Sequence, residues 1–176
     1  MNIILEEITD SGNPRLETII ELYEEAFPRR ERRETEDLKK MAAGSDMRLF
    51  AINSGEDTAG FIIVWELGDF TFIEHFAILG IMRGSGIGKA VMDKIVERFA
   101  GKMVFEVEPA EDEISCRRVE FYRRAGFEVL TENYIQPPYR EEDSPARMWL
   151  MSNIPCREDI HIDEYIRMIH EKVYEV

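Results

Sequence analysis

Hydrophobic positions in the first third of the chain change from a strand pattern to a helix pattern. Asn2 to Ile8 can form a short first strand, which ends at turn residues 11–14. A helix should follow and stop at Pro28, because its apolar residues recur at spacings of three and four. These residues are Leu16, Ile19, Ile20, Tyr23 and Phe27. A second short helix is predicted for Thr35 to Ala43, before Gly44.

Three extended segments come next. Met47 to Asn53 and Ala59 to Leu67 flank the turn residues Ser-Gly-Glu-Asp and therefore predict a hairpin. Phe70 to Leu79 predicts a third strand after Gly-Asp. Together with the first strand, these segments predict an antiparallel meander.

The second half of the chain alternates between helix and strand patterns. A broad apolar stripe predicts a helix from Gly86 to Gly101. The further elements expected are a strand at Met103–Val107, a helix at Ile114–Ala125, strands at Phe127–Leu130 and Arg147–Ser152, and a last helix that Asp163 can cap. We divide the chain into a main domain, residues 1–155, and a helical extension, residues 156–176, packed on that domain or on a partner.

Length and charge narrow the functional classes. The 176 residues fit one α/β domain. A formal net charge of −14 argues against binding to nucleic acid, because phosphate backbones are bound by clustered lysine and arginine. The excess of aspartate and glutamate over lysine and arginine has two interpretations. It keeps the protein in solution, or it also attracts a cationic amine substrate.

The two cysteines, Cys116 and Cys156, have no metal-ligand spacing and are too few for a disulfide framework. They predict free thiols in a reducing compartment. The first ten residues do not read as a signal peptide, and no apolar stretch approaches the length of a membrane helix. We therefore expect a cytoplasmic protein that binds no metal and no membrane.

The most informative segment is Arg83-Gly84-Ser85-Gly86-Ile87-Gly88-Lys89, which joins a strand to a helix. Glycines let backbone N–H groups converge, and a helix N-terminus adds partial positive charge, so this turn suits a phosphate or pyrophosphate. A P-loop is excluded, because its first glycine would fall on Arg83 and Ala90 follows Lys89. A dinucleotide fingerprint starting at Gly84 would need glycine in place of Lys89, and it also fails.

Residues 83–88 do match Gln/Arg-x-x-Gly-x-Gly/Ala, the acyl-CoA signature of the GNAT-type N-acetyltransferase superfamily, which this chain resembles. A second segment, Phe121 to Phe127, is similar to that family's Tyr-x-x-x-Gly-Phe element. The resemblance extends to the order of elements up to about Met151. It implies the GNAT fold, an α/β (α+β) arrangement with a mixed, mostly antiparallel central sheet of six to seven strands flanked by helices.

The resemblance also implies which residues contact acetyl-CoA. The backbone of Phe76, Ala77 and Ile78 would bind pantetheine and polarise the thioester carbonyl, and residues 83–89 would bind the pyrophosphate. Ser115 stands where family members often have an asparagine that contacts the cofactor. A serine hydroxyl would serve more weakly, so that contact is in doubt.

Three residues are candidates for catalysis. Tyr122 matches the family's general acid near the sulfur of CoA. Glu74 is the best candidate for the base, because it is a lone carboxylate between Phe72 and Phe76, which should raise its pKa; a salt-bridged or substrate-orienting role is equally open. His75 points to the opposite face in a regular strand, but a β-bulge would bring either side chain inward.

These features predict an N-acetyltransferase, an enzyme that transfers acetyl from acetyl-CoA to a primary amine of a small molecule or peptide by direct attack on the thioester. The alternative is a non-catalytic acyl-CoA-binding or sensing module. A longer acyl group also stays open, as does the choice between monomer and homodimer.

Overall fold

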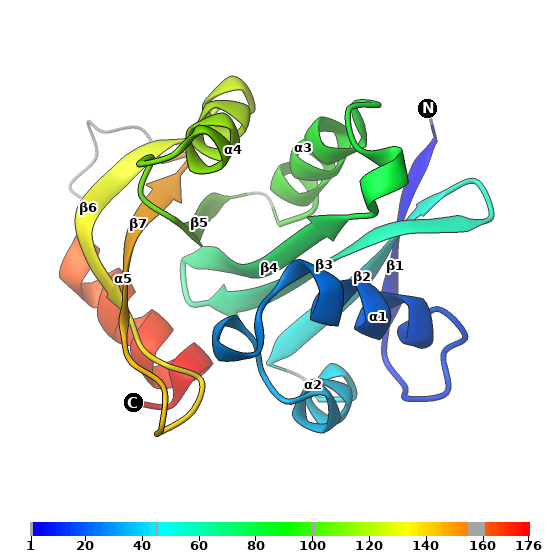
Figure 1. Ribbon diagram of the computed structural model, residues 1–176, viewed down its shortest axis with the longest axis horizontal. Helices are drawn as coiled ribbons and strands as arrows, with labels where there is room; N and C mark the ends of the chain where they lie inside the picture. Colours follow the sequence, from blue (N-terminus) through cyan, green and yellow to red (C-terminus); the bar gives the residue numbers. More distant parts are fainter. Residues whose placement is uncertain (1, 45, 100, 155–160) are drawn as a thin grey trace.

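A computed structural model describes residues 2–44, 46–99, 101–154 and 161–176, and these form one seven-stranded mixed sheet flanked by helices (Figure 1). The strands lie in the order β1-β2-β3-β4-β5-β7-β6. Their bounds are β1 Ile3–Ile8, β2 Met47–Ser54, β3 Asp57–Leu67, β4 Phe70–Ile78, β5 Lys102–Val107, β6 Glu128–Gln136 and β7 Ala146–Ser152. The helices are α1 Leu16–Ala26, α2 Thr35–Ala42, α3 Ile87–Phe99, α4 Glu113–Arg124 and α5 Ile162–Ile169. The predicted fold class is confirmed.

The helices cover the two faces of the sheet. In Figure 1, α3 and α4 lie on one side of it and α1, α2 and α5 lie on the other. Each side has its own hydrophobic cluster: Phe72 of β4 belongs to the α1 side, and Ile73 belongs to the α3 side. The two faces are therefore distinct chemical environments. Because side chains alternate along a strand, the position of a residue in the strand decides which face its side chain contacts.

The sheet opens between β4 and β5. These strands pair in parallel only from Phe70–Ile73 to Lys102–Phe105. Beyond Ile73, the register of β4 continues with β3 alone, and beyond Phe105 that of β5 continues with β7 alone. The end of β4 therefore has one edge that the neighbouring strand does not cover, and a gap in the strand pairing divides the sheet into two arms.

A β-bulge lies at the start of this gap. His75 pairs with Ile63 of β3, whereas Ile73 pairs with the next residue, Val64, so Glu74 is an extra residue in β4. A bulge interrupts the alternation of side chains. As a result, Glu74 and His75 both lie on the α1 side, and the pleat resumes with Phe76 on the α3 side.

The end of the chain packs on the α1 side. Tyr165 of α5 stacks on Phe70 at 4.3 Å between ring centroids, and Ile169 is buried in the same cluster. A π-helical turn, η3 (His170–Tyr174), continues α5 and buries Val173 and Tyr174. The boundary at residues 155 and 156, and Cys156 itself, lie outside the described residues; Cys116 is a free, exposed thiol.

Two local predictions were wrong. The strand expected at Phe127–Leu130 extends to Gln136, because β6 remains paired with β7 across two irregularities in its register. Asp163 does not cap α5: the capping residue is His161, whose side chain makes no capping hydrogen bond, and Asp163 lies in the first turn. An acid in that position still interacts favourably with the helix dipole.

Candidate active site

On the side of β5, no described strand pairs with the backbone of Phe76, Ala77 and Ile78. On the other edge these residues pair with Ile62, Phe61 and Gly60 of β3. An extended chain with amide groups can add to such an uncovered edge as a further strand does. The three residues expected to bind pantetheine therefore lie where a pantetheine arm would have backbone partners.

The glycine-rich turn lies at the end of this edge. Gly84 and Gly86 have φ values of +78° and +85°, a backbone conformation that residues with a Cβ rarely adopt. Helix α3 begins at Ile87, and the N–H of Ala90 donates to the Gly86 carbonyl at 3.1 Å. The N–H groups of residues 87–89 therefore precede the first helical hydrogen bond and are directed out of the helix N-terminus. The backbone of this turn therefore has the geometry of an anion-binding site.

Side chains of the turn mainly hold its shape. Arg83 Nε donates to the Ile78 carbonyl at 2.9 Å, and Ser85 Oγ donates to the Met82 carbonyl at 2.5 Å. Lys89 pairs with Asp93 at 2.6 Å, one turn along α3. Gly88 packs closely on Phe121: a Cβ at this position would lie 3.1 Å from the ring, which would have to shift by a few tenths of an ångström.

Tyr122 of α4 lies on the α3 side, with its ring 4.4 Å from that of Phe105 in β5. Burial raises the pKa of its phenol to about 12, and Arg118 lowers it slightly. Within the described part of the chain, no group hydrogen-bonds to the Tyr122 hydroxyl. Tyr122 therefore keeps its proton at neutral pH.

Ser115 takes part in the cap at the start of α4. Its backbone N–H donates to the Asp112 carboxylate at 2.8 Å, and its hydroxyl accepts from the Asp112 N–H at 3.0 Å. This reciprocal pair is a capping box at the start of α4. Because the hydroxyl also donates to the Asp112 carbonyl, it is occupied within the helix cap rather than directed at a cofactor.

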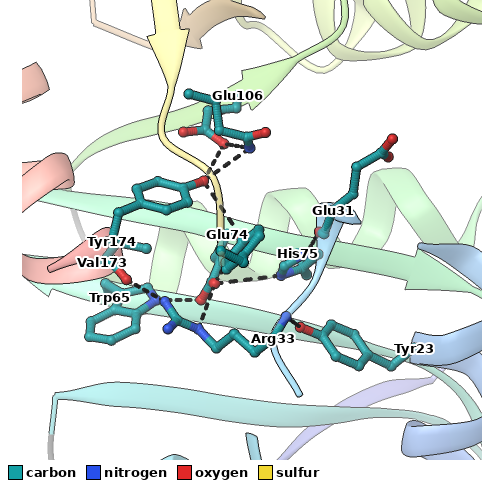
Figure 2. Close-up of polar contacts among 11 residues, drawn as sticks. Tyr23, Glu31, Arg33, Trp65, Glu74, His75, Glu106, Val173 and Tyr174 are labelled. Carbon is teal, nitrogen blue, oxygen red and sulfur yellow. Dashed lines mark hydrogen bonds and ion pairs between the residues drawn. The ribbon is translucent and has the colours of Figure 1, made fainter. Parts of the chain in front are cut away.

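Glu74 lies in a polar cluster on the α1 side (Figure 2), and its own side chain has no exposed surface. Its carboxylate accepts from Arg33 Nε at 2.9 Å, from Trp65 Nε1 at 2.7 Å and from the Tyr139 hydroxyl at 3.0 Å. Burial alone would raise its pKa, but the charge of Arg33, together with His75 and these hydrogen bonds, lowers it below the ordinary value.

The expectation of a raised pKa at Glu74 was therefore wrong. It assumed that Phe72 and Phe76 share the face of Glu74, but the bulge places Phe76 on the opposite side. It also missed Arg33, whose side chain is 13% exposed and lies between the rings of Trp65 and Tyr139, at 5.4 and 5.3 Å from their centroids. The salt-bridged alternative describes Glu74.

His75 is buried among Tyr23, Phe27 and Tyr139. Its Nε2 lies 2.9 Å from the Glu31 carbonyl, which can only accept, so Nε2 carries the proton. Burial lowers the pKa of the imidazole, and the ring is neutral at pH 7. Its other nitrogen, Nδ1, is buried without a hydrogen-bond partner, 3.8 Å from Glu74 Oε1.

A second buried carboxylate, Glu106 of β5, stands on the other arm of the gap. Its partners are uncharged: it accepts from the hydroxyls of Tyr134 and Tyr174 at 2.5 and 2.8 Å, and from the amide of Gln136. Burial raises the pKa of Glu106 to about 7, although the hydrogen bonds from Tyr134, Tyr174 and Gln136 act against the shift. A carboxylate with this pKa is suited to exchange protons near neutral pH.

The sequence did carry a signal for Glu106. It is the one charged residue in the apolar segment Met103–Val107, the same pattern that singled out Glu74. No such signal marked Arg33, which belongs to a dense charged run, or Tyr174, which belongs to an amphipathic helix near the end of the chain.

Two searches of the described residues gave negative results. No group of three or more His, Cys, Asp or Glu side chains there is arranged to hold a metal ion. Nor does any described helix combine the length and the apolar character needed to cross a membrane.

Comparison with known proteins gave consistent matches. The family model described as "Acetyltransferase (GNAT) family" matches residues 16–127. A search of curated proteins found no significant match. A solved structure from Bacteroides thetaiotaomicron, assigned to the GNAT family of acetyltransferases, shares 30% sequence identity, covers 100% of this chain and 99% of its own, and superposes with a TM-score of 0.91.

More distant structures share the fold. Arabidopsis thaliana NAA60 in complex with acetyl-CoA is 18% identical, with 86% of this chain and 97% of that chain covered and a TM-score of 0.61. A chimeric spermidine N-acetyltransferase from Vibrio cholerae is 13% identical, with coverages of 86% and 94% and a TM-score of 0.63. With a family match over most of its length and a full-length relative at 30% identity, the chain belongs to the GNAT family of acetyltransferases.

Proposed function

We propose that the protein is an N-acetyltransferase that transfers acetyl from acetyl-CoA to a primary amine of a small molecule or peptide, with Glu106 as the base. The observation that carries this proposal is a buried carboxylate with a pKa of about 7 on one arm of the gap, opposite the backbone edge of β4. In this arrangement, a proton acceptor lies across the gap from the edge of β4 that we propose to bind acetyl-CoA.

The donor side rests on backbone groups. The uncovered edge at residues 76–78 offers amide partners to pantetheine, and the turn at residues 83–89 offers converging N–H groups to the pyrophosphate. Acetyl-CoA supplies the acetyl group as a thioester. One of the β4 N–H groups would hydrogen-bond the thioester carbonyl and stabilise the negative charge that develops on its oxygen.

The acceptor side lies on the opposite face, where three regions meet: Arg33 follows α1, Tyr139 follows β6, and Tyr174 ends η3. An amine arrives mostly protonated at neutral pH, so it must lose a proton before it attacks. Ionised Glu106 takes that proton. The neutral amine then forms its C–N bond to the carbonyl carbon as the C–S bond breaks. The nitrogen loses its second proton to solvent, from which Tyr122 regains the proton that it gives to the thiolate.

Tyr122 serves the leaving group. Its phenol, with a pKa raised to about 12, is protonated at neutral pH and can donate to the departing thiolate. Glu74 is less suited to proton transfer, because its ion pair with Arg33 stabilises the charged form. We assign it to holding Arg33 and Tyr139 in place.

The test is release of free CoA thiol from acetyl-CoA, screened against polyamines including spermidine, aminoglycosides, amino acids and peptide N-termini. We expect turnover with at least one class of amine and a mass increase of one acetyl group on its nitrogen. Tight CoA binding without turnover across the whole panel would overturn the enzyme proposal and favour a non-catalytic acyl-CoA-binding module.

A further inference from the structure

We propose that Tyr174, in the last turn of the chain, is a positioning residue of the active site that holds Glu106 in its reactive state. This inference rests on the proposed function for its catalytic meaning, but its structural part can be tested without turnover. It gives the helical extension a role in the chemistry rather than in packing alone.

The first support is where Tyr174 lies. Although 68 positions separate the two residues, its hydroxyl donates to Glu106 Oε2 at 2.8 Å, and it also accepts from the Gln136 amide at 3.0 Å. Its ring is packed against Tyr139, with 5.1 Å between centroids, and the residue is 8% exposed. Tyr174 is therefore built into the site instead of lying on its surface.

The backbone next to Tyr174 is also held. Arg33 donates to the Val173 carbonyl while it pairs with Glu74, and Figure 2 shows its guanidinium between the two. His170 Nε2 lies 3.1 Å from the Ile135 carbonyl of β6. One arginine thus fixes the end of η3 against β4, and one histidine fixes its beginning against β6.

The second support is that Tyr174 and Tyr139 lie side by side between the two buried carboxylates, each donating to one of them. Glu74 accepts from the Tyr139 hydroxyl, which lies 3.5 Å from the Tyr174 hydroxyl, and Tyr174 in turn donates to Glu106. These four side chains extend from β4 to β5 on the α1 side of the sheet. A tyrosine from η3 therefore lies between the two arms at this point, against the tyrosine that contacts Glu74.

The groups that face Glu106 come from several elements. Tyr134 and Gln136 belong to β6 and Tyr174 to η3, and the charge of Glu74 on β4 disfavours the ionised form of Glu106. Removing a donor from an ionised carboxylate destabilises the charged form and raises its pKa. Loss of the Tyr174 hydroxyl should therefore leave Glu106 protonated to a higher pH.

The direct experiment follows the titration of Glu106 by carbon NMR in protein labelled at the glutamate carboxyl carbon. Its signal is identified by its absence from Glu106→Gln. We expect Tyr174→Phe to raise the midpoint by about one pH unit, since a hydrogen bond to a charged group contributes roughly that much. Tyr165→Phe is the matched control, because its hydroxyl donates to a carboxylate, Asp69, away from the site.

The same variants are then compared by turnover. Tyr174→Phe should move the acid limb of the kcat/KM profile to higher pH by the same amount and regain activity in alkaline buffer, while CoA affinity stays unchanged. An unmoved Glu106 midpoint, or an equal movement in Tyr165→Phe, would overturn the inference. If no amine is acetylated, the NMR midpoint still decides the role of Tyr174 while the proposed function fails separately.

Discussion

The two arms of the opened sheet each place one buried carboxylate on the same face, yet the two acids have opposite properties. Glu74 on β4 is paired with Arg33, and its pKa lies below the ordinary value. Glu106 on β5 is surrounded by tyrosine hydroxyls and an amide, and its pKa is raised to about 7. Burial is the largest single effect on both, so the difference comes from whether the partner carries a charge.

This difference indicates that one carboxylate is suited to holding its neighbours in place and the other to transferring a proton. A neutral donor forms a hydrogen bond with a carboxylate and still allows it to take up a proton. A guanidinium forms the hydrogen bond and also stabilises the charged form of the carboxylate. Glu74 therefore anchors the loop after α1 and Tyr139, and Glu106 can exchange a proton near pH 7. Four experiments would sharpen or break this comparison.

The largest effect is expected for Glu106→Gln. Loss of the base should lower kcat/KM by about 100-fold or more, since general base catalysis contributes roughly 10²–10⁴-fold. CoA affinity, measured by calorimetry, should not change, because the donor edge is on the other arm. Glu108→Gln is the control, since Glu108 follows β5 and pairs on the surface with Arg118. Full activity of Glu106→Gln would remove Glu106 from catalysis.

Glu74→Gln should act mainly on stability. It leaves Arg33 mostly buried without a counter-charge, and breaking such a pair costs about 3 kcal/mol of unfolding free energy. Urea denaturation at pH 7 measures this loss. The double variant Arg33→Met with Glu74→Gln should recover much of it, because no uncompensated charge remains. A stably folded but inactive Glu74→Gln would reverse the assignment of the two carboxylates.

The pH dependence of stability should also distinguish the acids. The stabilising contribution of Glu106 is complete below its ordinary pKa of 4.5 and is lost as pH rises through about 7. It amounts to at most about 3 kcal/mol for a shift of this size. Glu74 has a lowered pKa, so its contribution is lost only as the pH falls through that lowered value.

The measurement is the unfolding free energy of wild type minus that of Glu106→Gln, from pH 5 to 8. His75 and His170 act in the opposite direction below their ordinary pKa of 6.5, because burial lowers the pKa of both, and the subtraction removes their contribution. The difference should decrease toward higher pH. A flat difference would mean that Glu106 ionises as readily in the folded chain as in the unfolded one.

The smallest effect is expected for Tyr122→Phe, which tests the leaving-group side of the same gap. Turnover should fall about tenfold, less than the roughly 10²–10⁴-fold typical of proton transfer by a side chain, because a thiolate can also leave without being protonated. CoA affinity should stay nearly constant, because the ring still packs on Phe105. Equal losses of turnover and CoA affinity would make Tyr122 a structural residue.

The sequence alone determined most of the donor side. The glycines at positions 84 and 86 and the start of α3 are consecutive or nearly so along the chain, so local conformational preferences fix their geometry. The order of strands and helices followed from hydrophobic periodicity for the same reason, and the family assignment agrees with it.

Only the tertiary structure decided the acceptor side. Arg33 meets Glu74 across 41 positions, and Tyr174 meets Glu106 across 68, so no local pattern could pair them. The bulge at Glu74 appears only once β3 and β4 are paired. Because the charge of the partner sets the direction of each pKa shift, the opposite shifts of the two carboxylates come from packing and not from the residue type, which is the same.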